Sequence, residues 1–175
     1  MTPMTRILKC NDTLVTATHL VLNGDLNEHG TVYGGKILDL VDGDASVSAM
    51  KVTPEVIVTA AMDHVQFLRP FKLRDAMTME SYVTGVGHRS IEVFCKMLAE
   101  HLESRQREVA FTAFFTYVIA NPESAVAYDV VEGQTAEQKS LVAGYEKRRA
   151  ARKQLRQSEL TVNQALTTKL PWEEK

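Results

Sequence analysis

Five stretches of the chain alternate apolar and polar residues with the period of two that is typical of half-buried β-strands. They are rich in Val, Ile, Thr, Phe and Tyr, and they cover residues 13–22, 56–67, 77–86, 90–102 and 109–120. Short links join the last three, so we expect an antiparallel meander there. Strands of this length twist, and the pattern therefore predicts a strongly curved sheet whose concave side another element must fill.

The stretch Gly35–Met50 is the strongest candidate for that element. Its apolar residues cover most of the circumference of a helix, which is typical of a helix meant for burial. Gly43 and several Ala and Ser residues keep its second half thin. Two acidic residues, Asp42 and Asp44, fall inside this apolar helix. Because a buried carboxylate needs a partner or a function, they are the first functional signal in the sequence.

The C-terminal part of the chain has a different composition. Residues 134–160 contain no Pro, a single Gly and many residues of high helix propensity. We therefore expect a domain over residues 1–133 and a charged helical extension over residues 134–175. The extension holds nine Lys and Arg against five Asp and Glu, whereas the rest holds 11 against 17. Its basic run is interpreted as a solvated helix face, or alternatively as a flank for a polyanionic ligand.

Composition narrows the class of protein further. With 175 residues, 45% apolar and 24% charged, the chain fits one soluble globular domain of ordinary size. No stretch approaches the roughly 20 apolar residues of a membrane span, and no apolar run near Met1 resembles a signal peptide, so we expect a cytoplasmic protein. Cys10 and Cys95 are too far apart for a disulfide framework and are expected to be plain thiols. Nucleic acid is not expected as a partner, because most of the chain is acidic and no recognition motif is present.

The loop before the helix carries the next candidate chemistry. Gly30 to Lys36 matches the opening of a phosphate-binding loop, but Ile37 stands where Ser or Thr would bind magnesium, so nucleotide hydrolysis is rejected. Gly34 and Gly35 would still expose backbone N–H groups at the positive end of the helix dipole. Such a position stabilises the oxyanion that develops from an ester or thioester carbonyl. The simpler alternative is that the two glycines only form a tight turn.

The spacing between the glycines and the acidic residue suggests a dimer. Asp42 lies about two turns, or roughly 10 Å, along the helix from Gly35. A single chain would struggle to place both on one reacting atom. Two helices packed side by side in a dimer could place Asp42 of one chain opposite Gly35 or Asn27 of the other.

Several short patterns occur in a specific order along the chain. They are Asn27-x-x-Gly30-x-x-x-Gly34-Gly35, Leu40-Val41-Asp42, Val58-Thr59-x-x-x-Asp63-x-Val65-x-Phe67-x-x-Pro70, Val86-Gly87-x-x-Ser90-x-Glu92-Val93 and Ala110-Phe111-x-Ala113-x-Phe115-x-Tyr117-Val118. Together they resemble the hotdog-fold acyl-CoA thioesterases, and among these the cytosolic acyl-CoA hydrolase group with its single-domain bacterial members. The resemblance implies an α+β fold in which a curved antiparallel sheet of about five strands wraps a long central helix, followed by a basic C-terminal helix.

The resemblance also assigns roles to residues. It implies that Asn27 and Asp42 are the catalytic pair, contributed by opposite subunits of a dimer that assembles further into a hexamer. It places coenzyme A along the subunit interface, against a loop that corresponds to Gly87, Arg89 and Ser90. It requires no metal and no cofactor. The chain departs from the group at Arg74, where Gly is usual, which puts the geometry of that turn in question.

We therefore expect hydrolysis of a fatty acyl-CoA thioester. Asp42 would act as general base on water or as nucleophile, Asn27 would position the water or the thioester, and the N–H groups of Gly34 and Gly35 would hold the carbonyl oxygen. A sensor that binds acyl-CoA without turnover, a hotdog dehydratase and a scaffold protein are the alternatives. A dehydratase would need a catalytic His; His29 is the only His near the proposed chemistry, and it is interpreted as a polar loop residue.

Overall fold

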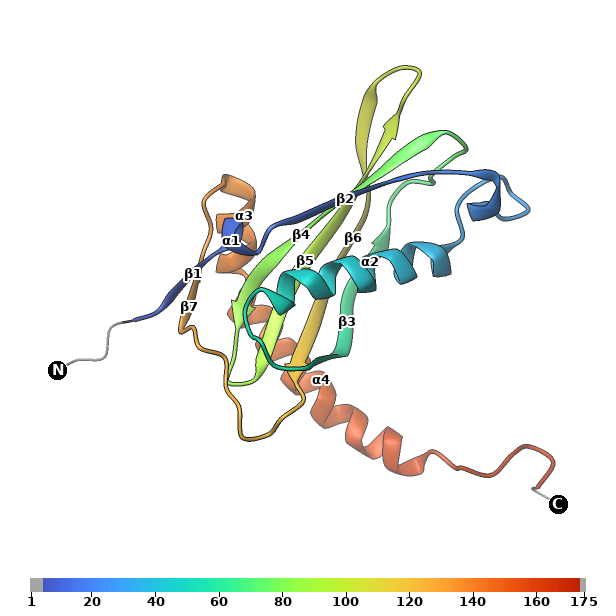
Figure 1. Ribbon diagram of the computed structural model, residues 1–175. Helices are drawn as coiled ribbons and strands as arrows, with labels where there is room; N and C mark the ends of the chain where they lie inside the picture. Colours follow the sequence, from blue (N-terminus) through green and yellow to red (C-terminus); the bar gives the residue numbers. More distant parts are fainter. Residues whose placement is uncertain (1–4, 174–175) are drawn as a thin grey trace. The chain divides into compact units, whose positions relative to one another are not determined.

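A computed structural model gives the structure of residues 5–173. The chain forms two compact units, one up to Val142 and one from Ala143 onward. The functional division at residue 133 that the sequence suggests stays a prediction. The first unit contains a five-stranded sheet, a long helix and a small two-stranded sheet (Figure 1).

The main sheet confirms the predicted architecture of five antiparallel strands. Along the sheet their order is β2-β4-β5-β6-β3, so that β4, β5 and β6 form the expected meander and β2 and β3 are the edges. Their bounds are β2 (Val15–Leu20), β3 (Ile57–Phe67), β4 (Asp75–Val86), β5 (Ser90–His101) and β6 (Gln106–Ile119). An edge strand leaves one row of N–H and C=O groups unpaired within the chain, which matters for the site described below.

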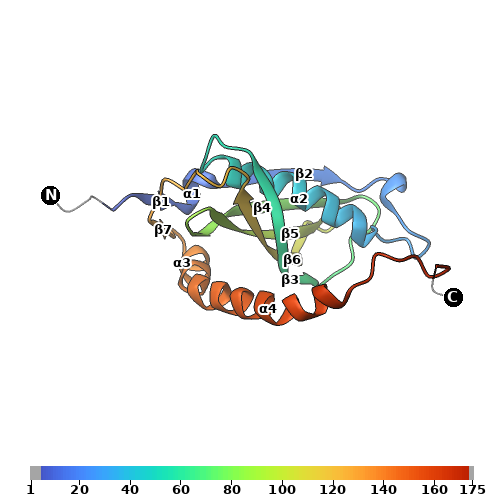
Figure 2. The same cartoon turned by 90° about the horizontal axis from the view of Figure 1, so that it is seen from below.

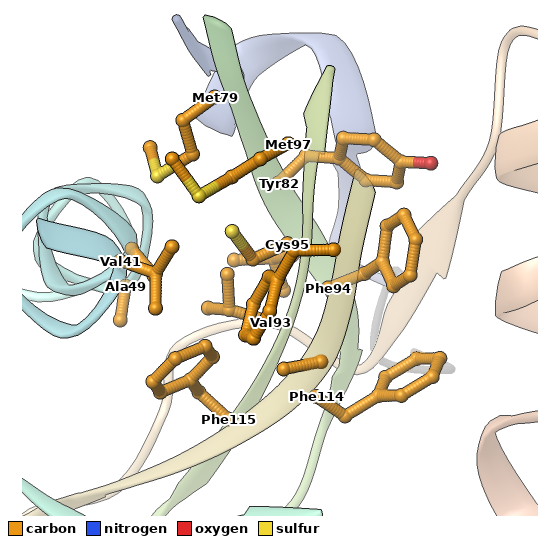
Figure 3. Packing of buried hydrophobic residues seen from close by; sticks show 14 of the residues in the cluster. Val41, Ala49, Met79, Tyr82, Val93, Phe94, Cys95, Met97, Phe114 and Phe115 are labelled. Carbon is orange, nitrogen blue, oxygen red and sulfur yellow. The ribbon is translucent and has the colours of Figure 1, made fainter. Parts of the chain in front are cut away.

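The long helix α2 (Gly34–Met50) lies across one face of this sheet (Figures 1 and 2). Figure 3 shows two of its buried side chains, Val41 and Ala49, pointing at the sheet residues Cys95 and Phe115. The apolar residues are expected to bury most of the circumference of this helix, but in the single chain only one stripe of it is covered. The buried stripe is Ile37, Val41, Ala45, Ser48 and Ala49.

The uncovered face of α2 includes two apolar side chains in its C-terminal half. Val47 is 42% exposed and Met50 is 55% exposed, although their neighbours on the buried stripe are fully covered. Asp42 and Asp44 are half-buried rather than sealed in the core. The circumference that looked apolar in the sequence is therefore only partly used for packing within one chain.

Strand β3 contains two irregularities that its sequence does not announce. Its register against β6 shifts by one residue between Thr59 and Ala61 and again between Asp63 and Gln66. His64, in the second bulge, has a φ of 51°, which is unusual for a residue other than glycine. A bulge re-aims the side chains that follow it. Residues paired across a sheet share a face, so Thr59 lies on the α2 side together with its partner Tyr117.

The opposite face of the sheet carries a second layer of apolar side chains, of which Tyr82, Phe94 and Phe114 are visible in Figure 3. The short helix α3 (Ala136–Ala143) is fixed on this side through Glu137, which accepts hydrogen bonds of 2.8 Å from Tyr82 Oη and from Lys96 Nζ. Lys96 and Tyr82 thus tie α3 to the back of the sheet.

The remaining elements flank this core or follow it. They are β1 (Ile7–Lys9), α1 (Cys10–Thr13), the 3-10 turn η1 (Asn23–Asp25), β7 (Val130–Glu132) and α4 (Tyr145–Ala165). β1 pairs with β7 in parallel. The single helix expected from residue 134 is in fact two helices, because the chain interrupts it at Gly144, a residue of low helix propensity.

Candidate active site

Asp42 lies in the middle of α2, where it meets the N-terminal end of β3. Thr59 Oγ1 donates a hydrogen bond of 2.9 Å to Asp42 Oδ1, and Tyr117 Oη donates one of 3.1 Å to the backbone carbonyl of Asp42. Burial, together with the nearby Asp42 charge, raises the pKa of Tyr117, so its hydroxyl stays a donor at neutral pH. Among the described residues no group donates to Asp42 Oδ2. One carboxylate oxygen is therefore held in place, and the other is available to a water molecule.

The predicted catalytic amide Asn27 is built into its own loop. Asn27 Oδ1 accepts hydrogen bonds from the backbone N–H of His29 at 2.9 Å, and from the N–H and hydroxyl of Thr31 at 3.1 and 3.2 Å. Within residues 5–173 its Nδ2 has no hydrogen-bond partner. Because the oxygen is consumed by the loop, Asn27 can meet a ligand only as a donor.

Asp25, just upstream, connects this loop both to the preceding segment and to the start of α2. Asp25 Oδ2 accepts hydrogen bonds of 2.9 Å from the Leu22 N–H and from His19 Nε2, and these two bonds hold the pKa of Asp25 below its usual value. The carbonyl of Asp25 also accepts a bond from the N–H of Tyr33, the residue before the helix. The loop that carries Asn27 is thus fastened at both ends.

The start of α2 presents bare backbone amides. Tyr33 occupies the N-cap position, and no side chain caps this helix. A Cβ placed on Gly34 would lie 3.5 Å from the ring of Phe67, whereas one placed on Gly35 would meet nothing within 4 Å. N–H groups at a helix start without a capping side chain form a site for a negatively charged oxygen. The open side of this site is at Gly35.

The structure divides the predicted site residues into two groups. Asn27 lies in the loop that leads into α2, and Gly34 and Gly35 begin the helix, where Gly34 is next to Phe67, the last residue of β3. Asp42 lies next to Thr59, near the first residue of β3. A single chain therefore does not bring the aspartate to the amide entrance, in agreement with the spacing along the helix.

The predicted coenzyme-binding turn belongs to the Asp42 end. Gly87 and Ser90 close the turn between β4 and β5 with a hydrogen bond of 2.7 Å, and the Arg89 carbonyl accepts a bond from the Ile119 N–H. In the register of the sheet, Ser90 and Val58 both pair with Val118, one residue from the partner of Thr59. The turn is thus at the same end of the sheet as Asp42.

Two further properties complete the description of the site. Over residues 5–173 there is no cluster of three or more His, Cys, Asp or Glu side chains placed to hold a metal ion. No helix in the described part of the chain has the length and apolar character needed to cross a membrane.

Comparison with known proteins decides the family. Residues 29–104 match the Thioesterase superfamily. The uncharacterized acyl-CoA thioester hydrolase YkhA of Bacillus subtilis is 38% identical over 172 residues, which are 98% of this chain and 99% of that protein. The chain belongs to the acyl-CoA thioester hydrolase family. The enzyme class expected from the residue patterns is thereby confirmed.

Solved structures confirm the hotdog fold of this thioesterase. The crystal structure of an acyl-CoA hydrolase from Bacillus cereus is similar with a TM-score of 0.84 and 35% identity, covering 91% of this chain and 98% of that one. An apo-hexameric acyl-CoA thioesterase is similar with a TM-score of 0.78 and 31% identity, covering 85% and 96% of the two chains. The long helix on an antiparallel sheet is therefore the fold of its relatives.

The residues that sequence reasoning left without a role are Thr59 and Phe67. Both occur in the patterns that carry the family resemblance, but nothing in the sequence says that Thr59 binds Asp42 or that Phe67 covers Gly34. Both contacts depend on where β3 lies relative to α2, and that placement follows from the pairing of β3 with β6.

Proposed function

We propose that this chain hydrolyses acyl-CoA thioesters to a fatty acid and coenzyme A, without a metal or cofactor. The observation that carries the proposal is the half-buried Asp42, whose Oδ1 is held by Thr59 while its Oδ2 is left to a water molecule. The uncapped backbone N–H groups of Gly34 and Gly35 supply the complementary part, a binding position for the thioester carbonyl oxygen. The activity in the names of the relatives agrees with this chemistry.

The complete site would be shared between two copies of the chain. The exposed edge of β3 carries apolar side chains, including Val58, which is 50% exposed, together with Met62 and Val65. If two β3 edges pair about a twofold axis they run antiparallel, so the Thr59 end of one strand meets the Phe67 end of the other. That pairing brings Asp42 of one copy to the Gly34 and Gly35 amides of its mate. The apolar face of α2 would be covered in the same step.

Larger assembly follows as an extension of the same proposal. A similar solved thioesterase is described as hexameric, and we propose that the dimers of this chain assemble likewise as a trimer of dimers. A cytoplasmic location stays a prediction, as does the absence of nucleic acid and membrane partners.

In the proposed reaction Asp42 acts as general base. Its Oδ2 removes a proton from a bound water, whose oxygen attacks the thioester carbon and gives a tetrahedral intermediate. The oxyanion is stabilised by the Gly35 N–H and by Asn27 Nδ2 of the other copy, at roughly 3 to 4 kcal/mol per donor in comparable sites. Collapse of the intermediate breaks the carbon–sulfur bond, and the proton held by Asp42 passes to the departing thiolate. The alternative, in which Asp42 attacks the carbon itself, would place solvent oxygen in the carboxylate of the enzyme.

The coenzyme part of the substrate is assigned to the turn between β4 and β5. Gly87, Arg89 and Ser90 lie at the Asp42 end of the sheet, and Arg89 supplies a cation for a phosphate group. With the thioester at the subunit seam, the coenzyme would extend toward this turn while the acyl chain extends away from it.

The direct test is release of free thiol from acyl-CoAs of several chain lengths, with purified protein. Turnover that is lost in Asp42→Asn and retained in Asp44→Asn supports the proposal, because the two carboxylates share one helix but only Asp42 contacts Thr59. Tight binding of acyl-CoA with no release of thiol would replace hydrolysis by the sensor alternative. Single-turnover hydrolysis in oxygen-18 water distinguishes the general base from the nucleophile.

A further inference from the structure

The Phe67 ring packs against the core on one side and is exposed on the other. It lies 5.2 Å from the ring of Phe111 in an edge-on arrangement, with 66° between the ring planes. Phe111 is completely buried in the core, whereas Phe67 is 53% exposed. The edge-on contact fixes the orientation of the Phe67 ring, and the exposed surface of that ring is available to a ligand.

The ring lies directly beside the bare amides. Its Cε1 and Cζ atoms would be 3.5 and 3.6 Å from a Cβ built on Gly34, which is ordinary van der Waals contact. The next residue, Gly35, faces open space. An oxygen bound by these amides would therefore have the Phe67 ring as its apolar neighbour.

The chemistry of a thioester decides which substituent lies against the ring. Its carbonyl carbon carries an oxygen, a sulfur that leads to the amide-containing pantetheine arm, and a carbon that begins an apolar chain. An aromatic surface favours the apolar chain, because burying methylene groups against it removes apolar surface from water. The polar pantetheine arm gains less from an aromatic surface than from hydrogen-bond donors elsewhere in the site.

We propose that Phe67 is a specificity-determining residue, whose ring contacts the first methylene groups of the acyl chain beside the amides of Gly34 and Gly35. This inference rests on the proposed thioester hydrolysis and on the seat assigned to the oxygen. It adds the substrate part that the site selects: an apolar chain of at least a few carbons. Phe67 does not take part in proton transfer, so its effect is on chain-length preference.

The test compares acetyl-, butyryl- and octanoyl-CoA as substrates of wild type, Phe67→Ala and Phe67→Leu. For Phe67→Ala we expect kcat/KM to fall about tenfold or more with the two longer substrates and about twofold or less with acetyl-CoA. Phe67→Leu keeps an apolar side chain and should lose part of the same preference. If size-exclusion chromatography shows that Phe67→Ala lowers the yield of dimer, Phe67→Leu is the variant to compare with wild type.

Leu102→Ala is the matched control, since it shortens an exposed apolar side chain in the turn between β5 and β6, away from the β3 edge and from Gly34. It should keep the wild-type ratio of activities on long and short chains. Equal loss on all three substrates in the Phe67 variants, or no loss, overturns the assignment of Phe67. Absence of thiol release from every acyl-CoA in wild type is a different result, because it rejects the proposed hydrolysis itself.

Discussion

Thr59 donates a 2.9 Å hydrogen bond to Asp42, and this bond joins the edge strand β3 to the middle of α2. A hydroxyl donor fixes the rotamer of the carboxylate and leaves its second oxygen pointing elsewhere. The contact therefore gives the aspartate a defined orientation without neutralising its charge, as a general base requires.

Replacing Asp42 and replacing Thr59 should both reduce turnover, but by different amounts. Asp42→Asn abolishes the base and should lower kcat by about 10²- to 10⁴-fold. Thr59→Val keeps the shape of the side chain but removes the donor, and about a tenfold loss is expected from a bond to a charged group. Steady-state kinetics measure both. Wild-type melting temperatures would show that the fold is intact, and unchanged kcat in Asp42→Asn would reject the mechanism.

Subunit exchange tests whether the site is shared. Asn27→Ala and Asp42→Ala should each be inactive alone, because each dimer then lacks one part of both sites. After mixing in equal amounts and full exchange, half of the dimers are mixed and hold one intact site of two, so about a quarter of wild-type activity should return. Exchange is verified with differently tagged chains. Verified exchange with no recovered activity would contradict a composite site.

Gly35→Ala should separate stability from activity. The position has space for a methyl group, and alanine is favoured over glycine in a helix, so the free energy of unfolding should stay equal or rise by about 0.5 kcal/mol. The methyl group would nevertheless stand beside the amide that receives the thioester oxygen, and kcat/KM should fall about tenfold. Urea denaturation and thiol release measure the two effects. Gly24→Ala, also in open space but outside the helix, should leave activity unchanged.

Arg74 is strained by its backbone, since its φ of 67° lies in the left-handed region. The turn is nevertheless formed, with the Arg74 N–H bonded to the carbonyl of Val21 at 3.1 Å. Arg74→Gly should therefore raise the free energy of unfolding by about 0.5 to 1 kcal/mol, because glycine adopts this conformation without a steric cost. Lys72→Gly, in the same turn with a negative φ, should give no gain. A loss of stability in Arg74→Gly would mean that the side chain itself stabilises the turn.

The hydrogen bond and charge of Asp75 raise the pKa of His101 above its ordinary value of 6.5, and Glu108 on β6 adds to the effect. A group whose pKa is raised by folding stabilises the protein while it is protonated. The contribution is therefore complete below pH 6.5 and is lost as the pH rises through the higher, folded-state value. His101→Gln should be less stable than wild type at pH 5.5, and the difference should shrink by pH 8.5. Urea titrations of wild type and His101→Gln at several pH values measure it.

The elements of this fold could be predicted because their signals are local. The apolar pattern places the helix within one residue of its observed start at Gly34, and the alternation places all five strands of the sheet. Asp42 could be picked out as a candidate site residue because a charge inside an apolar helix is costly. The same apolar pattern overestimated the burial of α2 in one chain. It reflects every surface of the helix that can pack, whereas one chain covers only a stripe.

The contacts of the site could not be predicted in the same way. The bulges near Ala60 and His64 carry no Gly or Pro signal, yet they set which side chains of β3 face α2. Without the register of β3 on β6, Thr59 could not be placed at Asp42. The use of Asn27 Oδ1 within its own loop was equally hidden, because Asx-type bonds depend on the backbone path from Asn27 to Thr31.

The contacts at opposite ends of β3, Thr59 with Asp42 and Phe67 with Gly34, have a consequence for regulation by abundance. In the proposed shared site, a lone chain holds both halves of the machinery but keeps them apart, so it would be an inactive precursor of the enzyme. Specific activity per chain should then decline on dilution below the dissociation constant for self-association. The expression level would thus set both the number of enzyme chains and the fraction of them that is associated and active.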